Sequence, residues 1–213
     1  ECVKLFCEPN GQFPHNPEPL KENLKDLSEL VIKEKADLGI VVDPDVDRLA
    51  FVSENGEVFG EEYTLVACAD YFLKNNPGNT VSNLSSSRAL KDVAELNGCK
   101  HFFSAVGEVN VVEMMKEKNA VIGGEGNGGI ILPELHYGRD ALVGIALFLT
   151  YLSRLNISCS QLRSTYPNYF MSKKKVELNK SLDVDLILEN LKRKYSKEKI
   201  NTHDGLKIDF KDS

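Results

Sequence analysis

The sequence lacks long hydrophobic runs, and this absence excludes a class of protein. A membrane-spanning helix needs roughly 18 consecutive apolar residues, and the most hydrophobic stretch, residues 141–152, is too short. We expect no secretory signal before Glu1. Because the chain opens on glutamate without a methionine, we expect that its natural N-terminus has been cut away. We therefore predict no membrane partner.

Cysteine is scarce and scattered. The five cysteines are odd in number and contain no C-x-x-C pair. Disulfide frameworks and cysteine zinc sites need regular, paired spacings, whereas buried reduced thiols do not. The sequence therefore predicts a cytoplasmic protein without a disulfide framework or a zinc site.

An excess of positive charge is also missing. The net charge of −6 argues against a nucleic-acid partner. A length of 213 residues, with 42% hydrophobic and 27% charged side chains, is ordinary for one or two globular domains. The charge is uneven, because residues 1–171 carry 15 basic and 24 acidic side chains whereas residues 172–213 carry 11 and 8. This shift predicts a boundary near Ser172.

Hydrophobic periodicity predicts strands that alternate with helices of ~10–15 residues, which is typical of an α/β layer fold. The expected helices cover residues 20–36, 61–74, 88–96, 109–118, 139–155 and 182–195. The expected strands cover residues 3–6, 38–42, 49–52, 81–84, 101–104, 120–123, 130–132, 169–178 and 206–210.

Three aspartates stand between the two expected strands at 38–42 and 49–52. They are Asp43, Asp45 and Asp47, and Arg48 follows directly. Carboxylates this close repel one another unless a cation neutralises them, and a hard divalent ion takes oxygen ligands. A purely structural Asp-Pro-Asp turn is the alternative. An EF-hand is excluded, because Arg48 occupies the position that needs glycine.

A second polar group lies in a glycine-rich stretch, residues 123–129. Glycine lets the backbone approach a ligand closely. Glu125 and Asn127 alternate, so both side chains can point to one side of an extended loop. A carboxylate next to an amide suits the hydroxyls of a polyol. A nucleotide-binding loop is disfavoured, since the stretch contains neither G-x-G-x-x-G opening a helix nor G-K-[ST].

Several other polar residues have local structural roles in our interpretation. We expect Asn16 and Ser87 to cap helices, Gly98 to end one, and Asp140 to serve the first turn of the helix at 139–155. The lysines at 173–175 are interpreted as a solvated strand edge, with a phosphate patch as the alternative.

Both motifs resemble loops of the α-D-phosphohexomutases. D-P-D-V-D-R at 43–48 is similar to the magnesium loop D-[GP]-D-G-D-R, and G-E-G-N-G-G at 124–129 is similar to the sugar-binding loop G-E-x-S-G-H. The resemblance implies that the three aspartates hold Mg²⁺ and that Arg48 lies beside the phosphate of a phosphoserine. It further implies sugar contacts from Gly124, Glu125 and Asn127. Gly107-Glu108 is a weaker match to a further ligand-contacting turn. The departures are Val46, Asn127 and Gly129.

The resemblance also implies a fold and a reaction. It predicts consecutive three-layer αβα domains with mixed sheets: the end of a second domain (1–53), a third domain (54–167) and the start of an α+β fourth domain (168–213). The expected activity moves a phosphoryl group between hexose 1-phosphate and 6-phosphate through a sugar bisphosphate. Glucosamine phosphate is the expected substrate, with mannose or glucose phosphate as the alternative.

Two further loops of that family have no match in this sequence. They are the catalytic T-A-S-H-N-P and the phosphate-binding R-x-S-x-T-E-P. We therefore expect a fragment that is inactive alone. A non-catalytic module that binds a metal or a sugar phosphate is the alternative from another class. An aspartyl phosphatase is disfavoured, because the glycine-rich Glu125 loop has no place in its chemistry.

Overall fold

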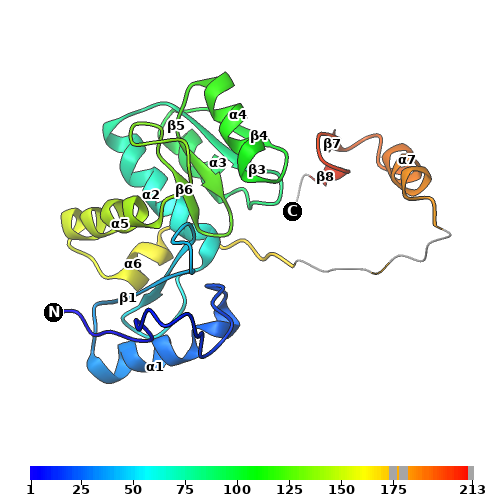
Figure 1. Cartoon of the computed structure of the whole chain (residues 1–213). Helices are drawn as coiled ribbons and strands as arrows, with labels where there is room; N and C mark the ends of the chain where they lie inside the picture. The colour runs from blue at the N-terminus through cyan, green and yellow to red at the C-terminus, as the bar shows by residue number, and fades with distance from the viewer. Residues whose placement is uncertain (173–176, 178–181, 211–213) are drawn as a thin grey trace.

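A short helical segment and a two-stranded hairpin form the first part of the computed structural model, which describes residues 1–172, 177 and 182–210 (Figure 1). The 3-10 helix η1 (Lys21–Asn23) leads into α1 (Lys25–Glu34). Strand β1 (Leu38–Val42) then pairs antiparallel with β2 (Leu49–Ser53). In this register Val42 lies opposite Leu49, so the residues between them close the hairpin.

Helix α1 packs directly on this hairpin. Gly39 makes the close approach possible, because a Cβ there would stand 2.8 Å from Cγ2 of Val31. The small core between helix and hairpin consists of Leu24, Val31, Ala50 and Val52. Burial of these apolar surfaces holds the hairpin in one register.

Two sequence predictions in this part are wrong. Residues 3–6 form no strand. Asn16 caps no helix, since its side-chain oxygen accepts a hydrogen bond from the backbone N–H of Glu18 (3.1 Å) and the helical turns begin only at Lys21. Pro17 and Pro19 explain the delay, because proline pushes the residue before it toward extended backbone.

A mixed four-stranded sheet forms the central part of the chain. Its order is β4-β3-β5-β6, with β3 parallel to both β4 and β5, and β6 antiparallel to β5. The strands are β3 (Asn79–Asn83), β4 (His101–Ser104), β5 (Ala120–Glu125) and β6 (Gly129–Ile131). The helices are α2 (Glu61–Asn75), α3 (Ala89–Leu96), α4 (Glu108–Lys118), α5 (Ala141–Leu155) and α6 (Cys159–Ser164).

Helices cover both faces of this sheet (Figure 1). The adjacent residues Ile130 and Ile131 of β6 point into different cores, because strand side chains alternate. Ile130 joins the core formed with α2, α3, α5 and α6, whereas Ile131 joins the core under α4. The predicted α/β fold with a mixed sheet is confirmed. Among the described residues, no helix has both the length and the apolar character needed to cross a membrane.

Most element predictions for this part are confirmed, with three differences. β5 extends to Glu125 and β6 starts at Gly129, so the glycine-rich stretch is a strand end with a short turn at 126–128. Ser87 does not occupy the N-cap of α3, which belongs to Arg88 and has no side-chain cap. Helix α6 was not predicted. Asp140 does cap α5, accepting a hydrogen bond from Val143 N–H (3.0 Å), and Gly98 directly follows the C-cap of α3 with φ +70°.

The last part contains α7 (Val184–Lys194) and a small hairpin of β7 (Lys199–Asn201) and β8 (Lys207–Asp209). The predicted helix and final strand are confirmed, whereas β7 was not predicted. In Figure 1 the hairpin lies beside β3 and β4, and Arg88 forms an ion pair with Asp209 (3.3 Å). The strand expected at 169–178 falls partly outside the described residues; its described residues 169–172 and 177 form no strand. The lysine run at 173–175 also lies outside them.

Candidate active site

The turn between β1 and β2, which we call the aspartate loop (residues 43–48), is folded around Asp43. Its Oδ1 accepts hydrogen bonds from the backbone N–H groups of Asp47 (3.1 Å) and Arg48 (3.0 Å). The backbone N–H of Val46 donates to the Asp43 carbonyl (3.1 Å). The loop closes through a left-handed residue, Val46, at φ 61°. Valine therefore adopts the conformation that glycine favours at this position.

The three predicted ligands converge. Asp43, Asp45 and Asp47 each bring a carboxylate oxygen within 4.8 Å of the others. Asp43 is buried and Asp45 is exposed. Oδ1 of Asp47 is buried without a hydrogen-bond partner, which is costly for a carboxylate. Converging carboxylates with one unsatisfied oxygen fit a hard divalent cation such as Mg²⁺.

The crowding of these acids changes their protonation. Burial, the adjacent Asp43 side chain and the charges of Asp43 and Asp45 raise the pKa of Asp47 to about 6, against the opposing charge of Arg139. Burial opposes ionisation of Asp43 too, but the N–H groups of Arg48 and Asp47 hold its pKa below the usual range. A cation would relieve this repulsion.

Arg48 is held at the edge of the same cluster. Its Nη1 donates to Oε1 of Glu18 (3.2 Å). Its Nε lies 3.6 Å from Oδ2 of Asp43 and 3.8 Å from Oδ1 of Asp47. The Glu18 side chain is 50% exposed and that of Arg48 is 31% exposed, so solvent reaches this ion pair.

The glycine turn (residues 126–128) meets the aspartate loop through the backbone. Leu49 N–H donates to the Gly128 carbonyl (3.2 Å), and Arg48 and Gly129 form an isolated antiparallel bridge. Ala141 N–H, at the start of α5, donates to the Val46 carbonyl (3.1 Å). The structure thus brings together two motifs that lie about eighty residues apart in the sequence.

The two polar residues of the glycine-rich stretch have different hydrogen-bond partners. Glu125 is 6% exposed. One of its oxygens accepts from Asn83 Nδ2 (2.8 Å) and the other from Arg139 Nη1 (2.8 Å). Asn127 turns back and accepts from Gly129 N–H (3.2 Å).

Sequence reasoning missed Arg139, which links the predicted residues. Its guanidinium forms an ion pair with Asp47 and donates to Glu125 and to Oε2 of Glu108 (3.2 Å). Its backbone N–H also donates to Oε1 of Glu108 (3.2 Å). No local sequence pattern predicts this role, because all three partners of Arg139 lie on other elements. Asn83, the other partner of Glu125, was likewise missed.

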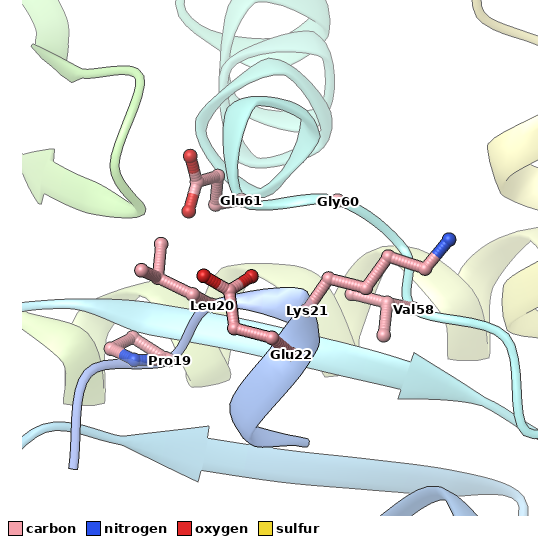
Figure 2. A pocket seen from close by; sticks show the side chains of 7 residues that line it. All are labelled: Pro19, Leu20, Lys21, Glu22, Val58, Gly60 and Glu61. Carbon is pink, nitrogen blue, oxygen red and sulfur yellow. The ribbon is translucent and has the colours of Figure 1, made fainter. Parts of the chain in front are cut away.

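A pocket of about 260 Å³ opens close to this site, lined by Pro19, Leu20, Lys21, Glu22, Val58, Gly60 and Glu61. Figure 2 shows Glu61, from the first turn of α2, facing Leu20 and Glu22 across the opening. Pro19 follows Glu18, the partner of Arg48. The pocket lining therefore begins at the residue next to the partner of Arg48.

Comparison with known proteins assigns the family. Residues 60–169 match the family model for phosphoglucomutase/phosphomannomutase, alpha/beta/alpha domain III, and residues 1–56 match the model for domain II. The chain belongs to the phosphoglucomutase/phosphomannomutase family. The predicted resemblance to phosphohexomutases is thereby confirmed.

Individual members of the family agree with this assignment. The chain is 36% identical to a phosphoglucomutase/phosphomannomutase from Thermococcus kodakarensis, over all of this chain and 47% of that protein. It is 32% identical to a probable phosphoglucosamine mutase from Methanopyrus kandleri, over all of this chain and 48% of that protein. A phosphoglucomutase/phosphomannomutase family structure from Burkholderia thailandensis covers 98% of this chain with a TM-score of 0.84 and 27% identity, over 46% of its own length. The chain thus spans about half the length of these relatives.

Proposed function

We propose that the protein containing this chain is a phosphohexomutase that interconverts hexose 1-phosphates and 6-phosphates. One observation carries the proposal: in a chain of this family, the aspartate loop and the glycine turn meet through shared backbone hydrogen bonds and Arg139. Phosphoryl transfer between two hydroxyls of a sugar needs a cationic phosphate site beside a polyol site. Glucosamine phosphate is the substrate we favour, and mannose or glucose phosphate is the alternative.

The aspartate loop would serve the transferred phosphoryl group. Asp43, Asp45 and Asp47 would hold Mg²⁺, which supplies charge neutralisation when bound. Arg48 would bind the phosphate of the phosphoserine, exchanging its exposed partner Glu18 for phosphate oxygens. The sugar hydroxyl would form a new P–O bond as the serine P–O bond breaks, and its proton would end on the released serine oxygen. Positioning and charge would supply most of the catalysis.

The second motif would orient the sugar. Each carboxylate oxygen can accept more than one hydrogen bond, so Glu125 can receive a sugar hydroxyl while it keeps Asn83 or Arg139. Glu108, exposed to a greater extent than Glu125, would provide a second acceptor. Asn127 would contribute its side-chain amide to the sugar after losing its hydrogen bond from Gly129 N–H. Gly124 would let the backbone come close to the ligand.

The proposed domain organisation follows from the same assignment. Residues 1–53 would end the second domain, residues 54–167 would form the third, and residues 168–213 would begin the fourth. The phosphoserine would then belong to another part of the protein, and this chain alone would be inactive. We also propose a cytoplasmic location.

The deciding experiment is a mutase assay on the full-length protein with Mg²⁺ and a sugar bisphosphate primer. Phosphates of glucosamine, glucose and mannose would be offered side by side. A clear preference for one would support the reaction and name the substrate. Binding of Mg²⁺ without turnover of any of the three would favour the alternative, a module that binds a metal or a sugar phosphate without catalysis.

Asp45→Asn gives the first test of residue roles. Loss of one ligand and one charge is expected to reduce kcat at least about a hundredfold, as removal of a charge-stabilising group does. The matched control is Asp37→Asn, an exposed aspartate just before β1, which is expected to leave kcat unchanged. Activity of Asp45→Asn within a few-fold of wild type would remove Asp45 from the metal site.

A further inference from the structure

Arg139 gathers carboxylates from three separate elements. Asp47 comes from the aspartate loop, Glu125 from the end of β5 and Glu108 from the first turn of α4. Each side-chain nitrogen has a different partner: Nη2 meets Asp47, Nη1 meets Glu125 and Nε meets Glu108. A lysine could not do this, because its charge sits on one atom whereas the guanidinium is a planar fork with five donors.

The backbone of Arg139 is held in place on the hairpin of β5 and β6. Arg139 forms an antiparallel bridge with Ile131, and Asp140 N–H donates to the Ile130 carbonyl (2.8 Å). Asp140 in turn caps α5. The side chain therefore starts from a rigid position, and only its own torsions decide where the guanidinium lies.

Gly129 provides the space for the stem of this side chain. A Cβ built at Gly129 would lie 2.4 Å from Cδ and 3.1 Å from Cγ of Arg139. Contacts this short do not occur between real side chains, so any larger residue would displace the stem. Because Gly129 does not have a positive φ, its backbone is open to alanine.

The contacts of Asp47 show what the arginine does. Arg139 engages Oδ2, while the buried Oδ1 has no hydrogen-bond partner. One carboxylate oxygen of Asp47 belongs to the cluster with Asp43 and Asp45. The guanidinium thus fixes the rotation of the carboxylate and leaves Oδ1, which lies 3.8 Å from Arg48 Nε, without a hydrogen bond. Such outer partners orient metal ligands, and their loss typically costs 10–100-fold in metal affinity or activity.

We infer that Arg139 is a positioning residue that couples the metal-binding loop to the sugar-binding turn, and that Gly129 is required because it leaves room for the arginine stem. The inference rests on the proposed function, since it assigns a role within the same site. It predicts that a change at Arg139 or Gly129 alters both the affinity for Mg²⁺ and the KM for the hexose phosphate.

The test is calorimetric titration of the full-length protein with Mg²⁺, combined with steady-state kinetics. Arg139→Gln is expected to weaken Mg²⁺ binding at least about tenfold. A purely electrostatic role predicts the opposite sign, because removing a positive charge beside the aspartates favours a cation. Unchanged or tighter Mg²⁺ binding would therefore overturn the inference.

Gly129→Ala keeps every charged group and tests the steric part. It is expected to weaken Mg²⁺ binding and to raise KM in the same direction as Arg139→Gln, with the thermal midpoint used to confirm folding. Arg139→Lys keeps the charge without the fork and is expected to behave like the glutamine variant. Arg154→Gln, an exposed arginine at the end of α5, is the matched control and should change neither quantity.

The outcomes separate this inference from the proposed function. If the wild-type protein binds no Mg²⁺, the metal assignment of the aspartate loop fails first. If the wild type binds Mg²⁺ and turns over sugar phosphate, but Gly129→Ala and Arg139→Lys match it in Mg²⁺ affinity and KM, only the role of Arg139 is overturned.

Discussion

Val46 combines a β-branched side chain with a left-handed backbone, φ 61°. Such a conformation costs on the order of 1–3 kcal/mol for a residue other than glycine. It persists because both neighbouring contacts need it: Val46 N–H donates to the Asp43 carbonyl and Val46 O accepts from Ala141 N–H. Valine at this position therefore strains the aspartate loop.

Val46→Gly is expected to raise the free energy of unfolding by about 1 kcal/mol. Relief of the strain outweighs the roughly 0.5–1 kcal/mol that glycine costs through its freedom in the unfolded chain. Urea unfolding measures the change. Val46→Ala, which removes the branch but keeps Cβ, should give a smaller gain. A lower free energy of unfolding for Val46→Gly would show that the conformation is unstrained.

His101 begins β4, is half-buried and contacts the neighbouring strand β3. Its ring nitrogens lie 2.8 Å from Thr80 Oγ1 and 3.2 Å from Ser82 Oγ. Burial, followed by the charges of Lys91 and Lys207, lowers the pKa of His101 from 6.5 to about 3. Between these two values the unfolded chain binds a proton that the folded chain does not.

Stability therefore falls as the pH drops from about 6.5 toward 3, by at most about 1.4 kcal/mol per pH unit for this one proton. His101→Gln should show a flatter dependence of the free energy of unfolding on pH between 7 and 5. The exposed His203 provides the control, because His203→Gln should keep the wild-type slope. Equal slopes for wild type and His101→Gln would contradict a depressed pKa.

Glu54 joins two elements, since it follows β2 and binds the first turn of α6. Ser160 donates to it through both its backbone N–H (3.1 Å) and its hydroxyl. Burial opposes the charge, but hydrogen bonds from Ser158 and Ser160 outweigh it and lower the pKa of Glu54 to about 2. A carboxylate near a helix N-terminus also interacts favourably with the helix dipole.

Because folding lowers the pKa of Glu54, its charged carboxylate stabilises the fold fully above pH ~4.5, the pKa in the unfolded chain. This stabilisation is lost as the pH falls toward 2. Glu54→Gln is expected to lower the free energy of unfolding at pH 7 by about 1–2 kcal/mol, the usual range for hydrogen bonds to a charged group. The difference in free energy of unfolding between wild type and Glu54→Gln should be smaller at pH 3.5 than at pH 7. Glu57→Gln, in the same turn and exposed, should be neutral. A deficit independent of pH would assign the effect to packing.

Local patterns predicted most of the elements, because strand and helix periods depend on neighbouring residues. The aspartate loop is also local, which is why all three of its acidic residues were predictable. Predictions failed where contacts between residues far apart in the sequence determine the structure. Glu125 lies on a strand because β5 pairs with β6 across the glycine turn. Arg139 and Asn83 reach the site only through tertiary packing, so no spacing in the sequence connects them.

The parts of the molecule are joined in two different ways. β2 is tied to the central sheet by a hydrophobic core, in which Phe51 stacks on Phe148 of α5 at a ring distance of 3.8 Å. The aspartate loop and the glycine turn are thus held by the same core. The C-terminal hairpin instead contacts the sheet by polar groups: Asp209 binds Arg88, Lys207 donates to the Leu84 carbonyl (3.3 Å), and Asp204 accepts from Val106 N–H (2.8 Å).

Polar contacts near the surface contribute little free energy and open locally. Asp204→Ala is therefore expected to speed hydrogen exchange at the Val106 amide severalfold, as loss of one hydrogen bond of roughly 1 kcal/mol would. Exchange in α1, on the far side of the hydrophobic core, should stay unchanged. Mass spectrometry of peptides covering residues 104–108 and 25–34 measures both.

Asp185→Ala is the matched control, because this exposed aspartate lies in the first turn of α7. It should leave the exchange of Val106 at the wild-type rate. If Asp204→Ala also leaves that rate unchanged, the hairpin does not protect the turn before α4, and Glu108 at the start of α4 is then positioned by Arg139 without help from the C-terminal part.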